Sequence, residues 1–115
     1  MSSYVEVAPG QNEALIQGPK DVELGRWEPI ENIEDPYVQE MGRFSVMEHN
    51  KQTGANLKFI RVVNGEKQVV AGINYRLRIE ARNEMNLVWT YEAMVNDRPW
   101  EKKWKLIYFV PLLKN

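Results

Sequence analysis

Three residues of one apolar-periodic stretch have the side-chain types of a nucleophilic catalyst. Ser45 and His49 are four residues apart, so their side chains would meet on a helix, and Glu48 is nearby. No group that would stabilise an oxyanion is evident, however, and Ser45 lies near the apolar stripe of the predicted helix. A histidine late in a helix more often interacts with the terminal carbonyls. We therefore expect a protein that is not an enzyme.

Residue types and charge disfavour metal, cofactor and nucleic-acid sites. The chain has no cysteine and one histidine, which excludes a thiolate nucleophile, a disulfide and a Cys/His zinc site. A run of carboxylates before the predicted helix has no recognisable metal spacing; it comprises Glu28, Glu31, Glu34 and Asp35. The net charge of −1 gives no reason to bind a polyanion. Arg76, Arg78 and Arg82 share one strand face, which we interpret as a solvated face offset by Glu80.

Apolar residues gather in a segment that we predict to be a loop, the first loop (residues 68–72). Val69, Val70 and Ala71 stand there between Gln68 and Gly72. A contiguous exposed apolar patch usually marks a partner site. A plainer alternative stays open, in which this segment is the end of a β-branched strand.

A second apolar pair follows a polar turn and forms the second loop, Pro99-Trp100. Tryptophan is enriched at interface hot spots, and a preceding proline stiffens the loop before binding. The alternative is that Trp100 packs back against Trp104 or the helix, as most aromatic residues of a small domain do. The sequence therefore indicates a protein-binding surface rather than a reaction centre.

One helix is clearly signalled among the elements that must position these loops. Asp35 is a good N-cap with Pro36 at the first helical position, and Thr53-Gly54 supplies the stop. The apolar residues of one face are Val38, Met41 and Phe44. This pattern predicts a helix of four to five turns.

After the helix the period of the apolar residues changes from 3.6 to 2, which predicts strands. The predicted strands cover residues 26–30, 57–63, 73–81, 89–95 and 104–110. Asn64-Gly65 and residues 83–86 are turn-prone, and residues 96–99 are predicted to close the fourth strand. We expect an α+β fold in which one helix lies across an antiparallel meander. A ferredoxin-like arrangement is the weaker alternative, because it needs a second helix.

The meander places the loops together. Alternate turns of an antiparallel sheet fall at the same end, so the first and second loops are neighbours and residues 83–86 lie at the far end. The segment of residues 24–26, the trunk, joins them if the first strand pairs antiparallel with the second. The trunk and the two loops together then form one edge, the loop edge.

These segments resemble a known family. Gln68-Val69-Val70-Ala71-Gly72 is similar to the Q-x-V-x-G motif of the cystatins, and Pro99-Trp100 resembles their second-loop pair. Residues 41–50 (MGRFSVMEHN) resemble the helix signature of the plant cystatins, or phytocystatins. The likeness extends from residue 25 to about residue 111. It implies the cystatin-like fold, with one long helix across a five-stranded antiparallel sheet in the order β-α-β-β-β-β. It also implies reversible, tight inhibition of papain-like cysteine proteases.

The resemblance further implies the mechanism and the contact residues. In cystatins the trunk and both loops enter the protease cleft and block substrate without presenting a scissile bond. The residues implied to bind the protease are Leu24, Gly25, Arg26, Gln68, Val69, Val70, Ala71, Gly72, Pro99 and Trp100. Plant cystatins usually have a second trunk glycine where this chain has Arg26. We expect Arg26 to weaken inhibition or to shift selectivity towards acidic clefts, unless its side chain simply points to solvent.

The remaining expectations concern organisation and partners. Residues 1–24 read as a flexible arm and residues 25–115 as a single cystatin-like domain. We expect papain-like cysteine proteases as partners, and neither nucleic acid nor membrane. The active form is expected to be a monomer. A domain-swapped dimer is possible if the first loop opens. No signal peptide is visible, and both a secreted and a cytoplasmic location stay open. The alternative function is a binding module of the same fold with weakened or lost inhibition.

Overall fold

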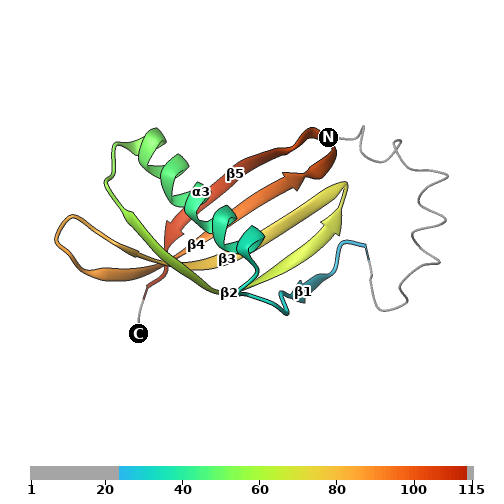
Figure 1. Cartoon of the computed structure of the whole chain (residues 1–115), viewed down its shortest axis with the longest axis horizontal. Helices are drawn as coiled ribbons and strands as arrows, with labels where there is room; N and C mark the ends of the chain where they lie inside the picture. Colours follow the sequence, from blue (N-terminus) through green and yellow to red (C-terminus); the bar gives the residue numbers. More distant parts are fainter. Residues whose placement is uncertain (1–23, 114–115) are drawn as a thin grey trace.

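The computed structural model describes residues 24–113 and shows one helix lying across one antiparallel sheet (Figure 1). The elements in chain order are β1 (Trp27–Pro29), α3 (Pro36–Thr53), β2 (Lys58–Val70), β3 (Gly72–Arg82), β4 (Val88–Arg98), the short 3₁₀ helix η1 (Pro99–Glu101) and β5 (Lys103–Pro111). The strands follow one another across the sheet in chain order. The predicted order β-α-β-β-β-β is therefore confirmed. The ferredoxin-like alternative is wrong, because α3 is the one α-helix among the described residues.

The helix begins and ends at the predicted signals. The Asp35 carboxylate accepts a hydrogen bond from the Tyr37 backbone N–H (3.0 Å), and Pro36 fills the first helical position, where no N–H partner is needed. Gly54 ends the helix at φ 81°, and its N–H donates to Asn50 O at 2.8 Å. These local contacts fix the two ends of α3, and so the points at which the chain leaves the sheet after β1 and returns to it at β2.

The core lies between α3 and the face of the sheet that the helix covers. Alternate residues of β3 and β4 point towards the helix, which is why the apolar residues of these strands have a period of two. The most deeply buried apolar residues are Met41, Val46, Leu77, Ile79, Ala81, Ala93 and Val95. The intervening residues of β3 form the opposite face of the sheet and are mostly polar or charged.

One predicted turn, Asn64-Gly65, is wrong, because the segment continues as strand. Asn64-Gly65 lies inside β2, just after an irregular register between Val62 and Asn64. Gly65 is packed closely there: a Cβ atom would come within 2.5 Å of Arg76 O and 3.2 Å of Ile30 Cδ1. The glycine therefore serves close approach of β3 and of the segment after β1, and not a turn.

The segment 96–99 ends β4, as predicted, but the strand continues through most of it. Asn96, Asp97 and Arg98 pair in register with β3 or β5, and β4 ends only at Arg98. The 3₁₀ helix that begins at Pro99 makes the turn, with Lys102 at φ 52°. The turn at 83–86 is confirmed, with the Asn83 N–H donating to Leu87 O at 2.9 Å and Asn86 at φ 69°.

The predicted arm lies outside the described residues, apart from its last residue, Leu24. Across residues 24–113, the structure contains no helix with the length and apolar character of a membrane span.

Candidate functional site

The trunk and the two loops lie at one end of the sheet, opposite the β3–β4 turn (Figure 1). Three exposed apolar side chains come from these three segments: Leu24 is 50% exposed, Val70 36% and Trp100 59%. The loop edge predicted from the meander is therefore present as a physical feature. Exposed apolar side chains gathered in this way are typical of a surface that binds a partner.

The first loop is a very tight connection. Val70 pairs with Gly72 at the end of the β2–β3 ladder, so Ala71 alone stands between the two strands. Gly72 has φ 92°, and a Cβ atom there would come within 2.6 Å of Asp97 O. Both the backbone conformation and the space thus require glycine at this position. Much of the segment belongs to β2, as the plainer alternative held, while Val70 at its tip is exposed.

The second loop is held against the first. Trp100 in η1 lies close to Gly72: a Cβ atom added to that glycine would be 3.4 Å from Trp100 Cη2. The Lys102 N–H donates to Pro99 O at 3.0 Å and closes the turn, while Arg98 and Glu101 form an ion pair at 3.6 Å. The alternative in which Trp100 packs back against Trp104 or the helix is wrong, because Trp100 is 59% exposed. The ring contacts of Trp104 are edge-to-face with Tyr37 and Phe44.

The trunk is attached to β2 at its first residues. The Gly25 N–H donates to Val69 O at 2.8 Å, and Gly25 O accepts from Gln68 Nε2 at 3.0 Å. Gly25 has φ 80°, whereas the φ angle of Arg26 is not positive. The first trunk position thus has the glycine conformation, and the second accommodates a side chain.

A buried carboxylate at the root of the second loop was not predicted from the sequence. Asp97 is 2% exposed; its Oδ2 accepts a 2.6 Å hydrogen bond from the Tyr37 hydroxyl, which in turn accepts from Trp104 Nε1 at 3.2 Å. Burial raises the pKa of Tyr37, and the bond to Asp97 raises it further. Tyr91, Ala93 and Val95 alternate along the strand, and continuing this period of two places residue 97 on the face of the sheet that the helix covers. The sequence periodicity therefore contained the signal that Asp97 is buried.

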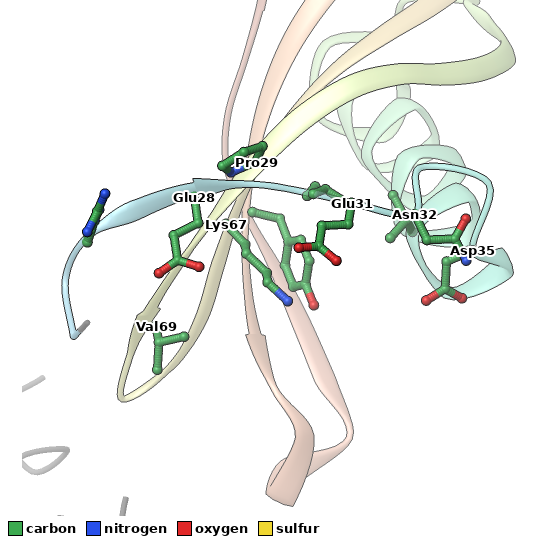
Figure 2. A pocket seen from close by; sticks show the side chains of 11 residues that line it. Glu28, Pro29, Glu31, Asn32, Asp35, Lys67 and Val69 are labelled. Atoms are coloured by element: carbon green, nitrogen blue, oxygen red, sulfur yellow. The ribbon is translucent and has the colours of Figure 1, made fainter. Parts of the chain in front are cut away.

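A groove of about 400 Å³ runs beside the trunk, between β1, β2 and the start of α3. Figure 2 shows Glu28, Glu31 and Lys67 projecting to the same side of β1, with Val69 of the first loop at one end and Asp35 at the other. Glu28, Glu31 and Asp35, from the predicted run of carboxylates before the helix, thus line a groove of mixed charge. Among residues 24–113 no group of acidic or histidine side chains has the geometry of a metal site.

The nucleophile hypothesis has no support in the geometry. Ser45 is fully buried and its hydroxyl donates to Met41 O at 2.9 Å. His49 instead stacks on Phe109, with ring centroids 4.3 Å apart, and burial lowers its pKa. The two side chains are therefore parts of the helix–sheet packing.

The arginine face of β3 is an ion-pair network. Arg76 and Arg78 both bond to the Glu66 carboxylate at 2.9 Å, and Arg78 also approaches Glu92 at 3.6 Å. Burial alone would raise the pKa of Glu66, but the bonds from the two arginines outweigh it and the pKa is lowered. The predicted counter-charge, Glu80, pairs with Arg61 instead.

Comparison with known proteins agrees with this architecture. A family model described as aspartic acid proteinase inhibitor matches residues 30–112. Cysteine proteinase inhibitor 5 of Arabidopsis thaliana is 47% identical over 88 residues, which are 76% of this chain and 72% of that protein. Putative cysteine proteinase inhibitor 7 of Oryza sativa subsp. japonica is 44% identical over 101 residues, 86% of each chain.

Solved structures give the same fold at much lower identity. The salivary cystatin of the soft tick Ornithodoros moubata superposes with a TM-score of 0.68 at 18% identity, covering 79% of this chain and all of that one. Dimeric human cystatin F gives a TM-score of 0.65 at 20% identity and covers 83% of this chain and 92% of its own. The fold is the cystatin fold, and the chain belongs to the cystatin family, among the plant cysteine proteinase inhibitors.

Proposed function

We propose that this protein is a reversible inhibitor of papain-like cysteine proteases that occludes the active-site cleft with its loop edge. The observation that carries the proposal is that the trunk and the two loops, far apart in the sequence, lie at one end of the sheet and carry the exposed side chains of Leu24, Val70 and Trp100. Relatives named cysteine proteinase inhibitors support the same conclusion. The proposed contact residues are those of the motifs: Leu24, Gly25, Arg26, Gln68, Val69, Val70, Ala71, Gly72, Pro99 and Trp100.

The geometry suits occlusion better than cleavage. The first loop is fixed on both sides by the β2–β3 ladder, and the second loop is closed by the bond from Lys102 to Pro99. Because this edge is already ordered in the free protein, little conformational entropy is lost on binding, which favours affinity. The apolar side chains of Val70 and Trp100 would bury against the protease, while the trunk would place Leu24 in an apolar subsite. The active form is proposed to be the monomer, because exchange of strands through the first loop would bury Val70.

The test is a titration of papain with the purified full-chain monomer. Loss of activity that is complete near one equivalent, with the inhibitor recovered intact by mass spectrometry, is the expected result. An aspartic protease assayed in parallel separates this proposal from the activity named by the matching family model. Inhibition of the aspartic protease alone would contradict the proposal.

A binding module without inhibitory activity is the second candidate, and Arg26 is the observation that favours it. A bulky cation stands where the family usually has glycine, two residues after Leu24, the trunk residue that is proposed to enter the cleft. A folded monomer that leaves papain and a related cysteine protease fully active would establish this alternative.

A further inference from the structure

A row of neutral amide side chains crosses the sheet on the face opposite α3 and connects all parts of the loop edge. This amide ladder consists of Gln68 on β2, Asn74 on β3 and Asn96 on β4. Gln68 lies directly opposite Asn74 in the β2–β3 register, and Asn74 lies directly opposite Asn96 in the β3–β4 register. Cross-strand neighbours of this kind are close enough for their side chains to bond.

The ladder is continuous from the trunk to the root of the second loop. Gln68 Nε2 donates to Gly25 O at 3.0 Å, and Asn74 Nδ2 donates to Gln68 Oε1 at 2.9 Å. Asn96 Nδ2 donates to Asn74 Oδ1 at 2.7 Å, and Arg98 Nε donates to Asn96 Oδ1 at 3.2 Å. Arg98 directly precedes Pro99-Trp100, so four successive bonds join the three segments.

The two ends of the ladder fix its direction. Gly25 O can only accept a hydrogen bond and the Arg98 guanidinium can only donate one. Each amide between them must therefore present its NH₂ group towards the trunk and its oxygen towards the second loop. A single residue that lacks a donor interrupts the whole row, even if it has the same shape.

The neighbouring row of the same face works differently. Two residues further from the loop edge along β2, Glu66 pairs with Arg76 and Arg78 through charged groups. Salt weakens such pairs where they are solvent-exposed, whereas bonds between neutral amides are little affected by ionic strength. A neutral ladder thus holds the same arrangement over a wide range of pH and salt.

We propose that Gln68, Asn74 and Asn96 are positioning residues that hold the trunk and the two loops in one mutual arrangement. The role of this arrangement in protease binding rests on the proposed function, but the arrangement itself does not. Asn74 lies in the middle of the row, two residues into β3 beyond the first loop, and supports the trunk only through Gln68.

Asn74→Asp in the full chain tests the proposal. Aspartate still accepts from Asn96 but cannot donate to Gln68 Oε1, so the bond from Gln68 to Gly25 is no longer supported. Asn64→Asp is the matched control: Asn64 lies on the same sheet face and accepts from Arg78 Nη1 at 3.1 Å, a bond that an aspartate keeps. Asn74→Ala serves as a second variant, which removes both bonds without adding a charge.

The first readout is amide hydrogen exchange in the free protein, followed by NMR. Exchange of the Gly25 N–H is expected to rise about fivefold in both Asn74 variants, while the core amides of Leu77 and Ile79 keep their rates. A rate at Gly25 equal to that of Asn64→Asp would overturn the proposal. An equal rise at Gly25 and in the core would also overturn it, because Asn74 would then serve only the stability of the fold.

The second readout is papain inhibition at low and high salt. The Asn74 variants are expected to inhibit about fivefold less tightly than Asn64→Asp, to the same extent at both salt concentrations. Raised exchange with unchanged inhibition would overturn the positioning role. If the unmodified protein inhibits no protease, the proposed function fails, and the exchange measurement alone decides whether the ladder holds the segments together.

Discussion

Replacing Tyr37 by phenylalanine removes the hydroxyl that donates to the buried Asp97 carboxylate. Among residues 24–113, Asp97 Oδ1 has no hydrogen-bond partner, and Oδ2 accepts the 2.6 Å bond from Tyr37. The variant would therefore leave a carboxylate that is 2% exposed without this donor, directly beneath the second loop. We expect a marked loss of stability.

The magnitude follows from the two bonds that the hydroxyl makes. A hydrogen bond to a charged group contributes about 1.5–3 kcal/mol, and the bond from Trp104 Nε1 adds about 1 kcal/mol. Because the Tyr37 side chain is partly exposed, water can replace some of this, and we expect Tyr37→Phe to lower the free energy of unfolding by about 2–3 kcal/mol. With an m-value of about 1–3 kcal/mol/M in urea, the midpoint falls by about 0.7–3 M.

A double-mutant cycle with Asp97→Asn separates this bond from a general packing effect. In the Asp97→Asn background the partner is neutral, so Tyr37→Phe should lower the free energy of unfolding by about 1 kcal/mol less than in the unmodified protein. Urea unfolding of the four proteins, followed by tryptophan fluorescence, measures the difference. An equal effect of Tyr37→Phe in both backgrounds would refute the reasoning.

Three further predictions follow from the site and its surroundings. Gly72→Ala should destabilise the fold by about 1–3 kcal/mol in urea unfolding, because its φ of 92° and the Asp97 carbonyl both oppose a Cβ atom; an unchanged midpoint would contradict this. Burial raises the pKa of Tyr75 and of Tyr108 from 10.0 to about 12. The stability that this shift contributes is present below pH 10 and should be lost as the pH rises towards 12. Equal free energies of unfolding at about pH 9 and about pH 11.5 would exclude this pH dependence. Arg26→Gly should tighten papain inhibition by about two- to tenfold, because no long side chain is then immobilised at the interface, and equal inhibition constants over several papain-like enzymes would show that Arg26 has no such effect.

Elements whose signals are local could be predicted from the sequence. Asp35-Pro36 and Gly54 delimit α3 because capping depends on neighbouring residues alone. The alternation of β3 indicated which of its residues face the helix. From these elements the meander followed, and with it the meeting of the trunk and the two loops at one end.

Features that depend on register between strands could not be predicted. Asn64-Gly65 has turn-forming residues, yet it continues β2 because Gly65 is needed for close packing against β3. Asp97 belongs to the turn-prone segment 96–99, and its hydrogen bond to Tyr37, 60 positions away in the sequence, could not be predicted from its neighbours. The amide ladder likewise exists only once three strands are aligned. Long-range pairing therefore decided both the errors and the omissions.

The proposed protease-binding role is tested most directly by papain titration of Trp100→Ala and Val70→Asp, with Met85→Ala as the control. Met85 is 77% exposed at the opposite end of the sheet, so its loss should leave inhibition unchanged. Trp100 exposes 59% of its surface, roughly 150 Å², and burying this in a complex contributes up to about 4 kcal/mol at about 25 cal/mol/Å².

We predict that Trp100→Ala weakens inhibition at least about 30-fold, that Val70→Asp weakens it strongly, and that Met85→Ala matches the unmodified protein. Circular dichroism should show that all of them are folded. Equal inhibition by folded Trp100→Ala, Val70→Asp and Met85→Ala would contradict the claim that the loop edge binds the protease.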